Sequence, residues 1–354
     1  MDYAKLQDIL EEYLAKGYYP SAVCRVFDLR RTLWCCAVGD AQMGTWYDLA
    51  SVSKIVCTTM LLTLMDEGVL SPETRVLSVL PADAPGPVTR ERLSQTTVRQ
   101  LMTHTSGIVP WYPFYCDGRP FFTVLEHVLA STPPEEGVAY SDLNFMLCGQ
   151  IFSHLSGMTL REGLEAILRR RLGIRDIAYG PVDASLCAPC CYDNRIEKRM
   201  CAERGLSFDG WRPDGVPVLG ECNDGNAFYY WGGASGHAGV FSTAEALEEL
   251  CRFYLTTDSP VFIDAMREHA PERGLGFDMS FTYPDGCGHS GFTGTGLWIS
   301  REHGIGAVLL ANRLAFPDGH TTGNMNEVRR ALFYALLGRT PPCVTANTPA
   351  PARP

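Results

Sequence analysis

The sequence has no long apolar run, and no long run of basic residues stands out. Its 354 residues include 30 Lys and Arg against 40 Asp and Glu, which gives a formal net charge of −10. Nucleic acid is recognised through a basic surface, which this composition does not favour. No stretch approaches the roughly 20 apolar residues that a membrane-spanning helix needs. We therefore expect neither nucleic acid nor a membrane as a partner.

The first twenty residues lack the uninterrupted apolar segment of a secretory signal peptide. They mix Asp, Glu and Lys with scattered Leu and Tyr, which is typical of an amphipathic helix. Without an export signal, the fourteen cysteines are better explained as reduced thiols than as a disulfide framework. We therefore expect a cytoplasmic protein.

The densest group of cysteines has part of the spacing of a zinc site. It comprises Cys187, Cys190, Cys191 and Cys201. Cys187 and Cys190 are separated by two residues, as zinc ligands often are, but the other two form a poor second pair. We expect no metal and no organic cofactor, although the sequence leaves metal binding by these four thiols open.

Two common functional motifs are also missing. The chain has no G-x-S-x-G, which a Ser-His-Asp enzyme of the α/β-hydrolase type would carry. The glycine-rich segment Gly232–Gly239 lacks the G-K-[ST] of a phosphate-binding loop. A tight loop beside a cleft is the better prediction for it.

Strand-like runs stand near both ends of the chain. They are Ser21 to Phe27, Arg31 to Val38, Gly288 to Thr293, Leu297 to Ser300 and Ile305 to Asn312. Helical pieces broken by Pro- and Gly-rich loops fill the middle. The pattern predicts an α+β protein with one antiparallel sheet built from both chain ends, flanking helices and an inserted helical lobe. The expected units are residues 1–70 with 246–338, the lobe 71–245, and a disordered tail 339–354.

Ser51-Val52-Ser53-Lys54 opens a run from Ile55 to Met65 that is apolar on nearly every side. Such a helix is predicted to be buried. Residues i and i+3 share a helix face, so Ser51 and Lys54 can touch, and a buried lysine can act as a base for the hydroxyl. The alternative is an N-cap serine beside a solvated lysine. Ser53 is the rival nucleophile, but it points to another side of the helix.

Two further segments carry polar groups where a site needs them. Tyr140-Ser141-Asp142 opens a helix predicted from Leu143 to Leu155, where Ser141 or Asp142 could instead be an N-cap. Cys287–Gly294 places His289, Ser290 and several glycines on a strand, where a bulge is the alternative.

The ordered set Ser51-x-x-Lys54, Tyr140-x-Asp142 and His289-Ser290-Gly291 resembles the serine hydrolases of the penicillin-recognising superfamily. That superfamily holds class C β-lactamases, D-alanyl-D-alanine carboxypeptidases, D-aminopeptidases and family VIII carboxylesterases. The likeness spans about residues 20 to 338 and implies a β-lactamase/transpeptidase-like fold. Three motifs in the right order are far more specific than one.

The resemblance also implies roles for individual residues. Ser51 is the expected nucleophile, Lys54 its activating partner and Tyr140 the base that exchanges protons with Ser51 and the leaving group. The N–H groups of Ser51 and Phe292 are the expected oxyanion hole. The substrate-binding set is Asp142, His289, Ser290 and Gly291, with Gly291 letting the substrate approach.

Two departures from the family pattern bear on the substrate. The second motif usually ends in Asn, whereas an ionised Asp142 cannot donate a hydrogen bond. The third motif often begins with Lys, whereas His289 is charged only near or below its pKa. Both changes favour a substrate without an obligatory anion.

We therefore predict a serine hydrolase that acts on a small ester or amide, such as a D-amino-acid peptide or a muropeptide fragment. A β-lactamase or D,D-carboxypeptidase is the first alternative. A non-catalytic ligand-binding or scaffold protein on the same fold is the second. The sequence does not identify the acyl group, the leaving group, the final acceptor or the oligomeric state.

Other residues remain candidates for supporting roles. His104 and His237 are expected to be hydrogen-bonded structural residues, and His237 could line the site. Aromatic residues in loops of the lobe are candidates for a substrate wall, although packing would explain them equally well; they are Trp111, Tyr112, Phe114, Tyr115, Tyr229, Tyr230 and Trp231.

Overall fold

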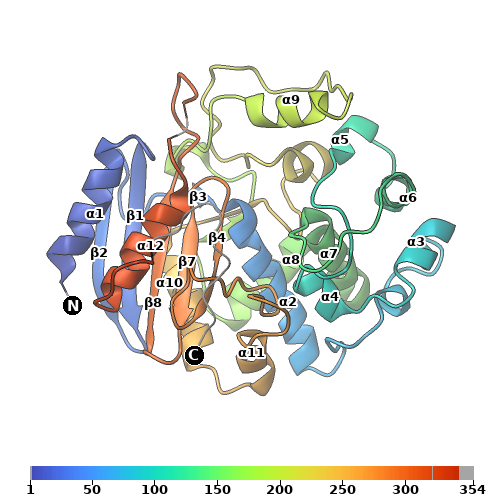
Figure 1. The fold of residues 1–354 in the computed structure, drawn as a ribbon, viewed down its shortest axis with the longest axis horizontal. Coiled ribbons are helices and arrows are strands. Elements are labelled where there is room, and N and C mark those ends of the chain that lie inside the picture. Colours follow the sequence, from blue (N-terminus) through green and yellow to red (C-terminus); the bar gives the residue numbers. More distant parts are fainter. Residues whose placement is uncertain (1, 321, 343–354) are drawn as a thin grey trace.

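The computed structural model describes residues 2–320 and 322–342. Its main sheet is antiparallel and has the strand order β2-β1-β8-β7-β6 (Figure 1). The strands are β1 Ser21–Asp28, β2 Thr32–Gly39, β6 Cys287–Ser290, β7 Gly296–Ser300 and β8 Ile305–Ala311. Because β1 pairs with β8, the two ends of the chain build one sheet, as the sequence predicted.

Alternate residues of the central strands pack against helices on opposite faces of the sheet. Helices α1 (Tyr3–Ala15) and α12 (Met325–Leu336) cover one face, where Cys24 and Leu309 are buried. Helix α10 (Ala244–Thr256) covers the other face, where Val23 is buried. The period of two along a strand explains this separation into two cores.

The remaining helices form most of the other half of the molecule. They are α2 Ser53–Asp66, α3 Pro87–Arg92, α4 Val98–Met102, α5 Phe114–Asp117, α6 Phe121–Ser131, α7 Asp142–Ser156, α8 Leu160–Leu164, α9 Arg195–Ala202 and α11 Pro260–Ala265. Further helical segments of 3₁₀ or π type are η1 Ala50–Val52, η2 Val76–Val79, η3 Glu165–Arg171, η4 Ala184–Leu186 and η5 Asn226–Tyr230. The chain also forms a small sheet that the sequence did not predict, with the order β3 (Tyr47–Asp48), β5 (Val240–Ser242) and β4 (Ile177–Tyr179).

Helix α2 runs through the interior between the two halves. Every residue from Ser53 to Met65 is buried, which confirms the prediction of an interior helix. Its apolar side chains pack against α7, α8 and α11. Ser51 differs slightly from the prediction, because it lies in the 3₁₀ turn η1 that precedes α2.

The strand predicted to reach Thr293 is shorter. β6 ends at Ser290 because Gly291 N donates to the Thr295 carbonyl at 2.8 Å and closes a turn. We propose the same units as the sequence suggested, 1–70 with 246–338 and the lobe 71–245. Most of the predicted tail, residues 343–354, lies outside the described residues. Within the described part of the chain, no helix has both the length and the apolar character that crossing a membrane would require.

Candidate active site

Ser51, Lys54 and Asp142 form one hydrogen-bonded chain at the junction of η1, α2 and α7. Lys54 Nζ lies 2.9 Å from Ser51 Oγ and 2.7 Å from Asp142 Oδ1. The lysine side chain has no exposed surface, whereas that of Asp142 is 18% exposed. An unpaired buried ammonium would be costly, so the carboxylate is the partner that this lysine requires.

Tyr140 lies against the same lysine. Lys54 Nζ is 4.7 Å from the centre of the Tyr140 ring. The segment around Tyr140 is held by His104, whose carbonyl accepts from Ala139 N at 2.9 Å and whose Nδ1 accepts from Ser141 N at 3.1 Å. The His104 and Tyr140 rings are 4.5 Å apart. His104 is therefore a hydrogen-bonded structural residue, as expected, and it holds the segment that carries Tyr140.

The surroundings favour a charged lysine and a neutral tyrosine. Burial opposes the charge of Lys54, but the Asp142 carboxylate and Tyr140 together raise the Lys54 pKa above its ordinary value. Burial also raises the pKa of Tyr140, although the Lys54 charge opposes that change. The sequence suggested a lysine that serves directly as the base. The ion pair with Asp142 argues against a neutral lysine in the resting state.

The turn that carries Ser51 has an unusual backbone. Ala50 has φ +45°, a conformation that residues other than glycine seldom adopt. The buried Asp48 holds this turn, because its Oδ1 accepts from Ala50 N at 2.9 Å and its Oδ2 from Asn223 N at 2.7 Å. Burial raises the pKa of Asp48 to about 6. An alanine gives no sequence signal of such a conformation.

The turn after β6 packs directly on the segment that precedes Ser51. Thr293 Oγ1 donates to the Asp48 carbonyl and Thr295 Oγ1 to the Leu49 carbonyl, each at 2.8 Å. A Cβ on Gly291 would lie 2.4 Å from the Leu49 carbonyl oxygen and 2.1 Å from Thr295 Oγ1. Glycine at this position therefore permits the two segments to touch, which is a reason for it that the sequence did not show.

Ser51 and Phe292 have free backbone N–H groups. Within the described residues, neither group donates a hydrogen bond to another part of the chain. Both residues line one cavity. Two free donors in the lining of the cavity that holds Ser51 are candidates for stabilising an oxyanion.

His289 does not supply a positive charge to this cavity. It is 3% exposed, and its Nδ1 lies 2.9 Å from the Ser290 carbonyl oxygen. Burial, together with the nearby Lys54 charge, holds the pKa of His289 well below its usual range. The imidazole is therefore neutral at physiological pH. It does not replace the positive charge of the lysine that often begins the third motif in the superfamily.

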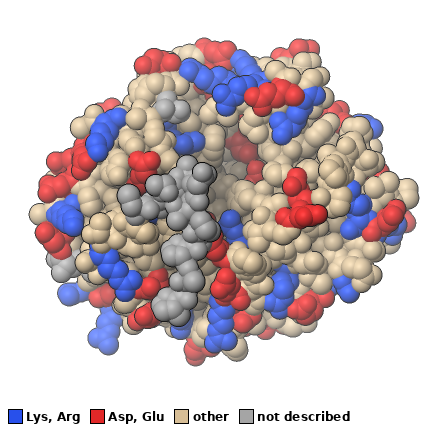
Figure 2. All heavy atoms as spheres, viewed as in Figure 1, with Lys and Arg blue, Asp and Glu red and all other residues tan. Residues whose placement is uncertain are grey.

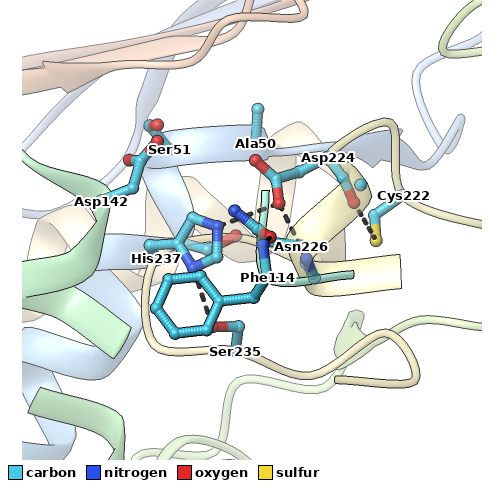
Figure 3. Close-up of polar contacts among 12 residues, drawn as sticks. Ala50, Ser51, Phe114, Asp142, Cys222, Asp224, Asn226, Ser235 and His237 are labelled. Carbon is cyan, nitrogen blue, oxygen red and sulfur yellow. Dashed lines mark hydrogen bonds and ion pairs between the residues drawn. The ribbon is translucent and has the colours of Figure 1, made fainter. Parts of the chain in front are cut away.

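His237 is tied into a second polar chain. Figure 3 shows its imidazole between Asp224 and Ser235, with contacts of 2.9 Å from Nε2 to Asp224 Oδ1 and 2.7 Å from Nδ1 to Ser235 Oγ. The His237 carbonyl accepts from Lys54 Nζ at 3.4 Å. His237 is thus hydrogen-bonded, as predicted, and it reaches the site through its backbone.

Among the described residues, two groups could hold a metal ion, and neither contains cysteine. They are Asp142 with Asp224 and His237, and the exposed group Asp285, Glu302 and His303. In the first group the ligand atoms already bind Lys54 or each other. The sulfur atoms of Cys190 and Cys191 are 3.8 Å apart. The sulfur atom of Cys201 lies 3.8 Å from that of Cys116, which is outside the predicted group.

A cavity of about 430 Å³ lies over Ser51. Its size suits a small ligand. Every predicted site residue except Lys54 lines it; these residues are Ser51, Tyr140, Asp142, His289, Ser290, Gly291 and Phe292. Figure 2 shows a hollow in this face of the molecule, below α9, bordered by acidic and basic side chains.

Three arginines that the sequence analysis missed also line the cavity. They are Arg273, Arg313 and Arg329. The Arg273 guanidinium lies 5.8 Å from the centre of the Tyr140 ring and 3.6 Å from Asp278 Oδ2. Its Nε is buried and has no hydrogen-bond partner in the described part of the chain. Of the seven aromatic candidates for a substrate wall, Trp111 lines this cavity.

The family model described as Beta-lactamase matches residues 6–331. The chain belongs to the beta-lactamase family. This membership confirms the resemblance and the predicted fold, and makes the protein a β-lactamase-related serine hydrolase. It therefore disfavours the scaffold hypothesis.

The chain is similar to proteins that have different names. A protein of Escherichia coli K12, provisionally named a D-alanyl-D-alanine carboxypeptidase, is 27% identical over 331 residues, covering 81% of this chain and 73% of the relative. The octameric penicillin-binding protein homologue from Pyrococcus abyssi has a TM-score of 0.70 at 17% identity, covering 96% of this chain and 78% of its own. A D-stereospecific amidohydrolase from Streptomyces has a TM-score of 0.66 at 22% identity, with 95% and 99% coverage.

Proposed function

We propose that the protein hydrolyses a small ester or amide, including D-amino-acid peptides or muropeptide fragments, through an acyl-enzyme on Ser51. The observation that carries this proposal is the 2.9 Å contact between Lys54 Nζ and Ser51 Oγ beneath a cavity that Tyr140 also lines. A nucleophile with a titratable partner at hydrogen-bond distance is the arrangement that covalent catalysis requires.

The proposed reaction has two steps. Once the Lys54–Tyr140 pair has lost a proton, Tyr140 accepts the proton of Ser51 while Oγ attacks the substrate carbonyl. The Ser51 and Phe292 N–H groups stabilise the oxyanion, and Tyr140 then protonates the leaving alcohol or amine. Water attacks the acyl-enzyme by the same route and releases the acid. Asp142 holds Lys54 in place and sets its charge.

Acyl-enzyme formation is the direct test of this function. We expect the intact mass to rise by the acyl group when the protein is mixed with p-nitrophenyl acetate, and peptide mapping to place the added mass on Ser51. D-alanine p-nitroanilide and acetyl-D-Ala-D-Ala, tested in parallel, separate the ester, aminopeptidase-like and carboxypeptidase activities. Labelling elsewhere, or no turnover of any of the three, would contradict the proposal.

A D,D-carboxypeptidase is the second candidate, and Arg273 is the observation that favours it. Its guanidinium is a cation in the lining of the cavity, where His289 is neutral, and Asp278 is its carboxylate neighbour at 3.6 Å. The name of the Escherichia coli relative supports a substrate with a terminal carboxylate. A β-lactamase activity would use the same charge for the β-lactam carboxylate.

Arg273→Gln is expected to raise KM for acetyl-D-Ala-D-Ala by about 10- to 100-fold, because a charge-assisted hydrogen bond contributes roughly 1.5–3 kcal/mol. The KM for the neutral acetate ester should stay within about twofold by the same argument. Exposed Arg267 provides the control Arg267→Gln, which removes one charge away from the cavity. An equal loss on both substrates would show that Arg273 does not recognise a carboxylate.

The compartment and partners belong to the same proposal. All cysteines in the described part of the chain are free thiols, which supports a reducing location such as the cytoplasm. The cavity size supports a small-molecule partner. Neither nucleic acid nor a membrane is proposed.

A further inference from the structure

Arg329 is a buried arginine of α12 whose guanidinium reaches the turn between β6 and β7. Its Nη2 donates to the Gly291 carbonyl at 3.1 Å and to the Thr295 carbonyl at 2.6 Å, while Nη1 donates to Asn326 Oδ1 at 2.7 Å. We propose that Arg329 is a positioning residue that orients the Gly291–Phe292 peptide for oxyanion binding. This inference rests on the proposed function and names a residue on which the oxyanion hole depends.

The argument starts from the geometry of one peptide group. The carbonyl of Gly291 and the N–H of Phe292 belong to the same planar unit and point in opposite directions. A donor that fixes the carbonyl therefore also fixes the direction of the N–H. A charged donor on the carbonyl oxygen also polarises the peptide, which strengthens the N–H as a donor.

Other contacts also hold this turn, and one of them shares the Gly291 carbonyl with Arg329. Gly294 N also donates to the Gly291 carbonyl, at 3.1 Å. Arg313 Nε binds the following carbonyl, that of Phe292, at 2.7 Å. The Thr293 and Thr295 hydroxyls bind the segment ahead of Ser51 and set the distance between the two N–H groups. Arg329 is the cationic donor on the peptide that contains the Phe292 N–H.

The sheet makes room for this guanidinium at Gly296. A Cβ on Gly296 would lie 2.8 Å from Arg329 Nε and 3.1 Å from its Cδ. Gly296 is the first residue of β7, and a residue without a Cβ lets another group approach the backbone closely there. Here the approaching group is Arg329, so Gly296→Ala is a second way to displace the guanidinium while the arginine stays present.

Arg329 also lines the cavity, so a direct contact with an anionic substrate must be distinguished from positioning. Its two terminal nitrogens are already engaged by Gly291, Thr295 and Asn326. Nε has no partner in the described part of the chain. Positioning affects kcat and transition-state binding, whereas substrate contact affects KM for anions alone.

The test compares three variants with the wild type: Arg329→Ala, Arg329→Lys and Gly296→Ala. The substrates are p-nitrophenyl acetate and acetyl-D-Ala-D-Ala. Phenylboronic acid is the inhibitor, because it forms a tetrahedral adduct with a nucleophilic serine. We expect kcat of Arg329→Ala to fall about 10- to 100-fold, since loss of a full oxyanion donor costs about 10²–10³-fold. The KM for both substrates should change less than twofold, and boronate affinity should fall in parallel with kcat. Added guanidinium ion should restore part of the Arg329→Ala activity.

Arg330→Ala is the matched control, because the next residue of α12 loses the same charge but packs beside the Phe281 ring at 5.2 Å. It should behave as the wild type. A KM increase confined to acetyl-D-Ala-D-Ala, or unchanged kcat and boronate affinity in all variants, would overturn the inference. If Arg329→Ala fails to fold, Gly296→Ala and Arg329→Lys decide the same question. A wild type without an acyl-enzyme or boronate adduct would instead overturn the proposed function, and this inference with it.

Discussion

Ser51→Ala is expected to lower kcat by at least about 10³-fold and to abolish acyl-enzyme formation, because the acyl group would have no oxygen to bind. Cavity and oxyanion donors persist in this variant, so substrate should still bind and KM should change little. The rate of p-nitrophenyl acetate hydrolysis, corrected for the buffer, and the intact mass after mixing measure the two effects. The thermal midpoint should remain close to that of the wild type, since only one oxygen is removed from a partly exposed side chain.

Ser53→Ala is the matched control for this experiment. Ser53 has no exposed surface, and its Oγ accepts a hydrogen bond from Val240 N at 3.0 Å. Removing Oγ leaves that buried N–H without a partner and should cost about 1–3 kcal/mol of stability. Activity at a temperature where the variant is folded should stay within a few-fold of the wild type. Inactivity of Ser53→Ala together with an active Ser51→Ala would assign the nucleophile to Ser53.

The sequence predicted the site residues best where a short motif or a known family pattern carries the chemistry. Ser51 and Lys54 meet because three residues of helical rise place them on one face, although a 3₁₀ turn supplies the first part of that rise. Tyr140 lies far away in the chain, and the resemblance rather than any local pattern placed it in the site. The main sheet was predicted because β-like runs stand near both ends of the chain.

The residues that the sequence missed acquire their roles from tertiary packing. Arg329 and Arg330 are neighbours on α12, and the first is 3% exposed while the second is partly exposed. Charged residues are mostly found at the surface, so nothing in the sequence distinguishes an arginine that will be buried against two carbonyls. Arg273 is half-buried, and nothing in the sequence distinguishes it as a residue that lines the cavity. The strands of the small sheet contain two or three residues each, which is too short for an alternating pattern to appear.

The pairing of Lys54 with Asp142 changes the chemistry that the motif alone suggested. A lysine buried without a carboxylate would have a lowered pKa and could serve as a base at neutral pH. The carboxylate at 2.7 Å instead raises the pKa of Lys54 and stabilises its ammonium form. It also repels a phenolate on Tyr140. We therefore infer that Asp142 sets the pH at which the Lys54–Tyr140 pair can lose its proton.

Asp142→Asn is therefore expected to move the acidic limb of the kcat/KM profile to lower pH by about one pH unit or more, since an opposite charge at this distance changes a pKa by about 1–3. The direction of this pH shift follows from the two neighbours of Asp142, which are Lys54 and Tyr140. Removal of the negative charge lowers the pKa of Lys54, which loses its counterion, and that of Tyr140, which loses a repelling charge. Because activity requires the deprotonated pair, the variant should exceed the wild type by roughly tenfold for each pH unit that the limb moves, at pH values below the wild-type limb. Because the pKa values of both Lys54 and Tyr140 are raised, initial rates on the neutral acetate ester are measured from pH 5 to about 11 and corrected for the buffer reaction. The ester does not titrate in this range.

Asp278→Asn provides the control, because this cavity carboxylate lies beside Arg273 and makes no ion pair with Lys54. Its acidic limb should coincide with that of the wild type. An Asp142→Asn limb at the wild-type pH would show that another group controls the rate, and Asp48, with a pKa of about 6, would be the next to substitute. Loss of activity at every pH in a folded Asp142→Asn variant would mean that the carboxylate itself takes part in the reaction. Asp142 controls the charge on Lys54 only if the Asp142→Asn variant stays active and its acidic limb moves to lower pH.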